Sequence, residues 1–176
     1  MFIPGIIITI ATFPGILIHE LAHMLVCRLL RVRVMKVCYF RFSNPHGYVI
    51  HERPSSVLAD VAIGFGPLLI NTLAGAVIAL PGAMTARRLE IGTRLDYILL
   101  WLGISIAMHS FPSTGDAKSI WQGIWRSKSG FLARLIALPF VIVIYIGAMG
   151  SIIWLDLIYG VSVVMLFPDL IARLLR

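Results

Sequence analysis

The sequence predicts an all-α polytopic membrane protein with four to five transmembrane helices and a small β-hairpin after the first helix. Hydrophobic residues make up 59% of the 176 residues and charged residues 13%, whereas an average soluble domain has about 25% charged residues. Several apolar runs approach the roughly 20 residues that a membrane-spanning helix needs. A chain of this length suits one domain, so residues 1–176 are expected to form a single membrane-embedded unit.

The first apolar run, Phe2–Val26, is predicted to be a transmembrane helix. The segment that follows is rich in β-branched and aromatic residues. Two such runs, Val34–Phe42 and Tyr48–His51, flank the sequence SNPHG, whose Asn, Pro and Gly favour a turn. This pattern indicates a β-hairpin at the membrane surface, although an amphipathic loop fits the same short runs.

The second span is predicted over Val57–Leu80, with a break at Gly64, Gly66 and Pro67. The third span, Leu95–Phe111, is expected to stop at Pro112 because proline does not continue a helix. The stretch 113–130 is polar and is interpreted as a connection. These segments form the predicted core, about residues 1–120.

The last apolar run, Phe131–Phe167, lies in a C-terminal helical segment, 131–176, and is too long for one ordinary span. Two short helices that turn near 147–150 fit it, and so does one helix plus a surface segment. With five crossings and the N-terminus outside, Arg87, Arg88 and Arg94 alone among the 15 Lys and Arg lie on the outer side. The positive-inside rule favours this orientation. The net charge of +7 is thereby explained by loop orientation, and no nucleic-acid partner is expected.

Residues 19–23 read HELAH, an H-E-x-x-H motif inside the first apolar run. On a helix His19 and His23 share one face, so their imidazoles can bind one zinc ion at about 2.0–2.1 Å. Glu20 is then placed to activate water as a general base. Ionisable groups within apolar spans are usually functional. The alternative is a pair of core histidines and a glutamate bonded to neighbouring residues.

A third zinc ligand is expected, because catalytic zinc sites generally have three protein ligands and an open position. Asp116 is the best candidate, since it lies just past the inner end of the third span and at a depth similar to that of the two histidines. His109, Asp60 and Asp156 are competing ligands. His109 also fits the role of a residue that does not contact the metal but hydrogen-bonds to a ligand and so orients it.

These blocks resemble the site-2 protease family of intramembrane zinc metalloproteases. The match rests on the HELAH motif, on Gly66-Pro67 with Asn71, which is similar to the family's Gly-Pro-x-x-x-Asn stretch, and on Asp116 in a Gly-containing turn. The family commonly writes Leu-Asp-Gly in that turn, whereas Gly115 precedes Asp116 here. The resemblance covers about residues 10–120, and the C-terminal run finds no clear counterpart.

The resemblance implies hydrolysis of a peptide bond in or near a transmembrane segment of a membrane protein substrate. Zinc would be bound by His19, His23 and Asp116, with Glu20 as the catalytic residue. Asn71 would orient the substrate or stabilise the developing oxyanion; its alternative is an interhelical hydrogen bond, which membrane bundles use routinely. The expected location is the plasma membrane of a prokaryote, with the active site toward the cytoplasm.

The hairpin is expected to contact the substrate. A helical substrate must be unwound before attack, and an exposed strand can pair with an extended peptide. The residues predicted to make this contact are Val34, Val37, Tyr48 and Val49. Two other functions stay open: a metal-binding membrane transporter or sensor, and a catalytically silent scaffold that keeps a zinc site for stability.

Overall fold

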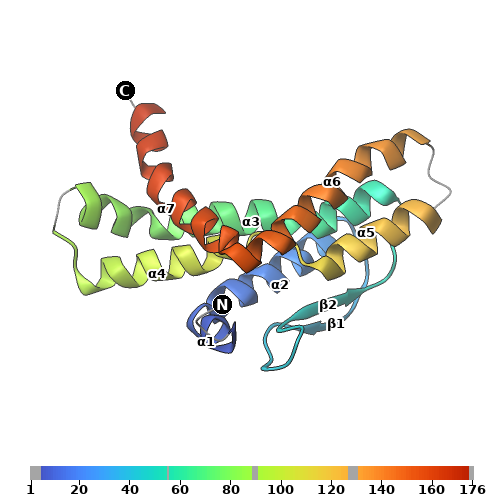
Figure 1. Ribbon diagram of the computed structural model, residues 1–176, viewed down its shortest axis with the longest axis horizontal. Helices are drawn as coiled ribbons and strands as arrows, with labels where there is room; N and C mark the ends of the chain where they lie inside the picture. The colour runs from blue at the N-terminus through green and yellow to red at the C-terminus, as the bar shows by residue number, and fades with distance from the viewer. Residues whose placement is uncertain (1–4, 55, 89–90, 127–130, 175–176) are drawn as a thin grey trace.

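The structure is a computed structural model that describes residues 5–54, 56–88, 91–126 and 131–174. It confirms a mostly helical chain with one two-stranded antiparallel sheet after the first helices (Figure 1). The elements are α1 (Gly5–Ala11), α2 (Phe13–Leu29), β1 (Val34–Cys38), β2 (Tyr48–His51), α3 (Val57–Ala83), α4 (Arg94–Met108), α5 (Thr114–Arg126), α6 (Phe131–Gly150) and α7 (Leu155–Leu174). A π-helical turn, Met84–Arg88, extends α3, and a 3₁₀ turn, Ser151–Ile153, follows α6.

The predicted first span is divided into two helices. Its first residue, Phe2, lies outside the described residues. Thr12 separates α1 from α2, and Pro14 occupies the first turn of α2, where proline is well tolerated because the amide there has no helical partner. The long inner part, α2, carries the HELAH motif toward the centre of the bundle (Figure 1).

The hairpin forms after α2 as predicted, with a shorter first strand. β1 ends at Cys38 instead of Phe42, and Cys38 pairs with Tyr48 at the loop end of the ladder. Val34 pairs with His51 at the other end, with an irregularity between Val34 and Lys36. The loop between the strands lies against α1 and α2: His46 Nε2 is 3.3 Å from the Thr9 hydroxyl, and a Cβ atom on Gly47 would lie 2.6 Å from Glu20 Cγ.

Helix α3 is continuous, so the predicted break at Gly64, Gly66 and Pro67 is wrong. The two glycines instead allow close helix packing. A Cβ atom on Gly64 would lie 2.8 Å from the Ile120 side chain, and one on Gly66 would lie 2.6 Å from the Val26 side chain. Pro67 removes one backbone hydrogen bond, but neighbouring helices hold the helix on both sides of it.

Helices α4 and α5 lie end to end along α3. Gly103 of α4 packs against Gly75 in the second half of α3, and Gly123 of α5 packs against Asp60 in its first turn. The stretch 113–130, interpreted from the sequence as a polar connection, is therefore helical as far as Arg126; residues 127–130 lie outside the described residues.

Helices α6 and α7 also run end to end and do not fold back on each other near 147–150 (Figure 1). The Phe140 ring of α6 lies 4.8 Å from Phe65 of α3, and the Tyr159 ring of α7 lies 4.9 Å from Phe111 at the end of α4. The joint falls at 151–154, where Trp154 has a left-handed backbone with φ of 64°. The chain therefore resumes in the same direction after a single irregular turn.

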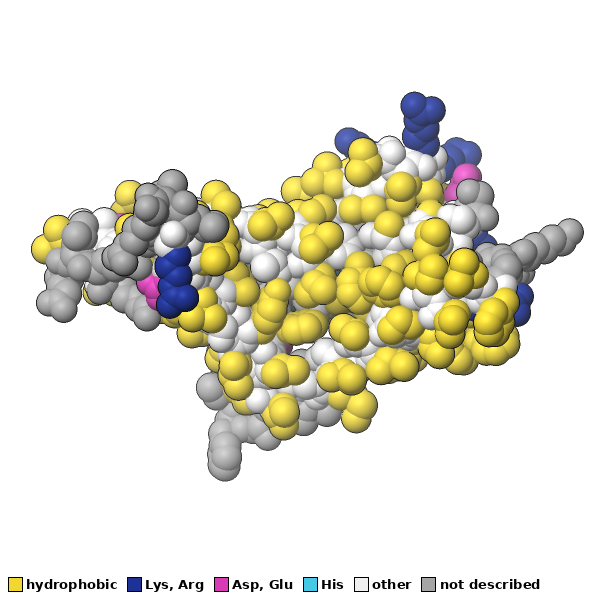
Figure 2. Space-filling view, turned by 90° about the horizontal axis from the view of Figure 1, so that it is seen from above, with side chains coloured by type: hydrophobic (Ala, Val, Ile, Leu, Met, Phe, Trp, Pro, Cys, Tyr) yellow, Lys and Arg dark blue, Asp and Glu magenta, His cyan; other side chains and the backbone are white. Residues whose placement is uncertain are grey.

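The buried core of α3, α5 and α6 is aliphatic, and much of the outer surface is apolar as well. The core cluster consists of Val57, Val61, Ala117, Ile120, Ile124, Ala137, Val141 and Ile144. Large exposed side chains include Leu69, Leu73 and Val77 on α3 and Leu132, Ile142 and Ile146 on α6. Hydrophobic side chains cover much of the face shown in Figure 2, and Lys and Arg lie toward the two ends of its long axis.

Among the described residues, one helical stretch, Val57–Ala86, is long and apolar enough to cross a membrane, with a mean hydropathy of 1.9. Arg134–Gly147 is a shorter apolar stretch. Length and composition therefore single out α3.

We expect Gly75→Leu to destabilise the fold, because a Cβ atom at this position would lie 2.6 Å from the Gly103 carbonyl oxygen. Overpacking of this kind typically costs about 1–3 kcal/mol. Thermal unfolding of the purified protein should show a lower midpoint than wild type. Leu73→Ala, at an exposed position on the same helix, is the matched control, and an equal loss in both variants would contradict close packing of α3 on α4.

Candidate metal centre

His19 and His23 lie on the face of α2 that points into the bundle, and both rings are fixed by backbone carbonyls. Nδ1 of His19 donates to the His109 carbonyl oxygen at 2.7 Å, and Nδ1 of His23 donates to the Ile63 carbonyl oxygen at 2.9 Å. Because a carbonyl only accepts hydrogen bonds, each neutral ring carries its proton on Nδ1. Each Nε2 is then left with a lone pair.

The two Nε2 atoms face each other at 3.1 Å. Two lone pairs at this distance repel each other unless a cation or a shared proton lies between them. This arrangement, with the second ring nitrogen bonded to a carbonyl, is the one that metal-binding histidines adopt in proteins.

The two carbonyls are available for a local reason in each case. Ile63 precedes Pro67 by four residues, and Pro67 has no amide hydrogen to donate to it. His109 follows the last residue of α4, so its carbonyl lies beyond the regular helix. The amide that would come next, of Ser113, donates to Asp116 instead.

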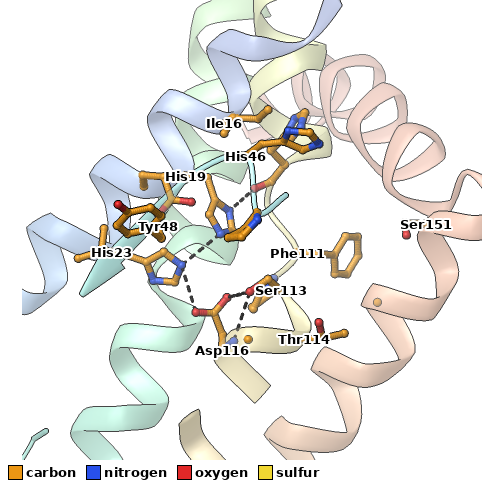
Figure 3. Close-up of a pocket in the computed structure, with 18 of the residues that line it drawn as sticks. Ile16, His19, His23, His46, Tyr48, Phe111, Ser113, Thr114, Asp116 and Ser151 are labelled. Atoms are coloured by element: carbon orange, nitrogen blue, oxygen red, sulfur yellow. Dashed lines mark hydrogen bonds and ion pairs between the residues drawn. The ribbon is translucent and has the colours of Figure 1, made fainter. Parts of the chain in front are cut away.

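Asp116 is held by a capping box at the start of α5. The backbone amide and the hydroxyl of Ser113 both donate to Asp116 Oδ2 at 2.7 Å, and the Asp116 amide donates to Ser113 Oγ at 3.3 Å. The other carboxylate oxygen, Oδ1, lies 3.5 Å from His23 Nε2 (Figure 3). One oxygen of Asp116 therefore caps the helix and the other points to the histidines.

The three side chains form a group that could hold a metal ion. One ligand atom from each of His19, His23 and Asp116 lies within 4.8 Å of the other two. Ligands that bind zinc tetrahedrally at 2.0–2.1 Å are about 3.3 Å apart, which falls between the 3.1 Å and 3.5 Å separations observed here. The structure thus brings together the three residues that the sequence predicted to bind a metal ion.

None of the competing candidates joins this group in the described part of the chain. Asp60 packs against Gly123 of α5. Asp156 and the His109 side chain line the cavity but do not join the group formed by the three ligand atoms. The His109 backbone carbonyl accepts from His19, whereas its side chain makes no such contact in the described structure; an orienting role for the His109 side chain stays a prediction.

The three ligands and Glu20 line a cavity of about 760 Å³ between α2, the hairpin, the α4–α5 junction and the start of α7. The Glu20 carboxylate adjoins the hairpin loop: a Cβ atom on Gly47 would lie 2.7 Å from Glu20 Oε1. Labelled neighbours in Figure 3 include His46, Tyr48 and Phe111.

Of the predicted substrate contacts, the structure brings Tyr48 and Val49 to the cavity wall, whereas Val34 and Val37 lie on β1 and do not line it. Asn71 is fully buried and also lies outside the lining. Its amide nitrogen, which carries two hydrogens, lies within hydrogen-bonding distance of three carbonyls, those of Gly15, Ile106 and His109, at 3.4, 3.4 and 3.1 Å. This is the interhelical link that was the alternative for Asn71.

Sequence reasoning missed Ser113 and the roles of Pro67 and Gly47. The spacing Ser113-x-x-Asp116 in front of an apolar pattern is a capping-box signature that could have revealed the role of Ser113.

Comparison of the chain with protein-family models, with curated proteins and with solved structures finds no significant match.

We expect Asp116→Asn to weaken zinc binding by at least about 100-fold, a larger loss than the 10–100-fold typical of residues that only support a ligand. Zinc affinity would be measured by competition with a chelator of known affinity. Asp156→Asn is the control, since Asp156 lines the same cavity without joining the three ligands. Equal affinities of wild type and Asp116→Asn would remove this carboxylate from the site.

Pro67→Ala should also weaken zinc binding, by roughly 10-fold or more. The new amide would compete with His23 Nδ1 for the Ile63 carbonyl. Pro81→Ala, at the other proline inside α3, restores an amide far from the histidines and should leave the affinity unchanged. If the two variants bind zinc equally, the free carbonyl does not matter for the site.

Proposed function

We propose that the chain is an intramembrane zinc metalloprotease that hydrolyses a peptide bond in or near a transmembrane segment of another membrane protein. The observation that carries the proposal is the convergence of two Nε2 lone pairs and one carboxylate oxygen beside Glu20 in one cavity. The resemblance of the same residues to the site-2 protease family supports this reaction class.

The donor set suits hydrolysis. A zinc ion held by His19, His23 and Asp116 would polarise the scissile carbonyl and lower the pKa of the attacking water. Glu20 accepts a proton from that water, whose oxygen bonds to the carbonyl carbon. Glu20 then delivers the proton to the departing amine nitrogen as the C–N bond breaks. The overall reaction consumes one water for each peptide bond.

The proposal places the bundle in a bilayer with four crossings: α2, α3, α4 with α5, and α6 with α7. At 1.5 Å per residue, α3 is about 40 Å long, and α4 plus α5 reach a similar length. The exposed apolar side chains support contact with lipid. The two joints lie next to the cavity, and irregular backbone at membrane depth is tolerated where it lines one.

In this layout the hairpin and the basic segment after α2 face the cytoplasm, as the positive-inside rule favours. Within the described residues, the two-stranded sheet leaves one edge of β2 without a neighbouring strand. A substrate segment that pairs with this edge would lie along the wall formed by Tyr48 and Val49. β2 is therefore the proposed docking strand for an unwound substrate.

Glu20→Gln tests the function. We expect cleavage of a single-span test substrate by the purified, zinc-loaded protein to fall by about 10²–10⁴-fold, the usual contribution of a general base, while bound zinc is retained. Glu52→Gln is the control, because Glu52 is exposed on the hairpin and pairs only with Arg33 among the described residues.

Wild type and Glu20→Gln also distinguish the protease from the scaffold and the transporter. A wild-type protein that binds zinc and cleaves nothing would contradict the protease assignment and favour the silent scaffold. Zinc movement into vesicles that is unchanged in Glu20→Gln would favour the transporter.

A further inference from the structure

Arg41 donates hydrogen bonds to three backbone carbonyls of the loop between the two strands. Its side chain donates from Nε to the Pro45 carbonyl at 2.7 Å and from Nη2 to the Asn44 carbonyl at 3.4 Å. Its backbone amide donates to the His46 carbonyl at 2.7 Å. A charged guanidinium makes stronger hydrogen bonds than a neutral donor, so one residue closes the loop 41–48.

Arg41 also connects this loop to the cavity wall. Its guanidinium lies 5.0 Å from the centre of the Tyr48 ring, within the range of a cation–π contact. Tyr48 begins β2 and lines the cavity. On the other side of the loop, His46 Nε2 lies 3.3 Å from the Thr9 hydroxyl of α1. The closed loop is therefore attached at both sides.

The closed loop presses its backbone against Glu20. A Cβ atom on Gly47 would lie 2.6 Å from Glu20 Cγ and 2.7 Å from Oε1, so a residue with a side chain cannot take this place unless Glu20 moves. Glu20 is 7% exposed, so its side chain is enclosed by its neighbours. Packing against Gly47 is thus a principal constraint on its orientation.

We propose that Arg41 is a positioning residue for Glu20: by closing the loop 41–48 it seats Gly47 on the Glu20 side chain and fixes the direction of the carboxylate. The inference rests on the proposed function, in which Glu20 handles the proton of the attacking water. Arg41 is not among the residues that line the cavity, so it acts through the loop. A shift of about 1 Å in a reacting group can cost about 10²-fold in rate.

The test compares Arg41→Gln with Lys36→Gln in the purified, zinc-loaded protein. Lys36 is the matched control because it lies on the same hairpin and its Nζ is 5.7 Å from the centre of the same Tyr48 ring, without the loop hydrogen bonds of Arg41. Three quantities are measured for each: kcat and KM on a single-span substrate, bound zinc, and hydrogen exchange of the peptide covering 41–48. Gly47→Ala is measured alongside.

We expect Arg41→Gln to speed exchange in the loop and to lower kcat at least 10-fold, with KM and bound zinc unchanged. Gly47→Ala should lower kcat similarly, and Lys36→Gln should stay within twofold of wild type. A loss in Arg41→Gln that falls on KM alone, that accompanies zinc loss, or that Lys36→Gln equals would overturn the proposal. If wild type cleaves nothing but Arg41→Gln still opens the loop, the proposed function fails while the loop closure is supported.

Discussion

Two backbone carbonyls without helical partners are the constraint on which the candidate site depends. The Ile63 carbonyl is freed by a proline within α3, and the His109 carbonyl is freed by the end of α4. Each accepts from Nδ1 of one histidine and so fixes both the ring orientation and the position of the proton. Because the carbonyls belong to different helices, the contact of α2 with both α3 and α4 builds the pair of lone pairs before any ion binds.

Two features of the bundle bring these helices into contact. Glycines allow close helix packing, and irregular joints divide the α4–α5 pair and the α6–α7 pair. On the long helix α3, Gly64 allows the close approach of α5 and Gly75 allows the close approach of α4. The joint between α4 and α5 and the joint between α6 and α7 both reach the cavity, which Phe111 and Ser151 line. Phe111 also packs on Tyr159 of α7. Polar backbone and short polar side chains thus gather at one level, while the rest of each pair stays regular and apolar.

The sequence predicted the elements whose signals are local. The i, i+4 spacing of His19 and His23 defines a shared face in any helix, and the turn residues of the hairpin lie within a few positions. The helix that carries Asp116 was missed because its polar residues dominate, although Ala117, Ile120 and Ile124 form its buried stripe. The Gly and Pro residues of α3 suggested a break, since the sequence does not show which neighbour fills the space above a glycine. The direction in which α7 resumes after the joint is likewise set by packing and not by the local pattern.

The double use of Asp116 has a thermodynamic consequence. One carboxylate oxygen caps α5 and the other is a candidate ligand. Binding of an ion to this site and ordering of the first turn of α5 are therefore thermodynamically coupled. Binding to a site that forms only in the folded state contributes to stability. If the site holds an ion as proposed, loss of that ion would loosen α5 and, through Ile120 and Ile124, its packing on α6. Removal of such an ion by a chelator would then destabilise α5 more than the other helices.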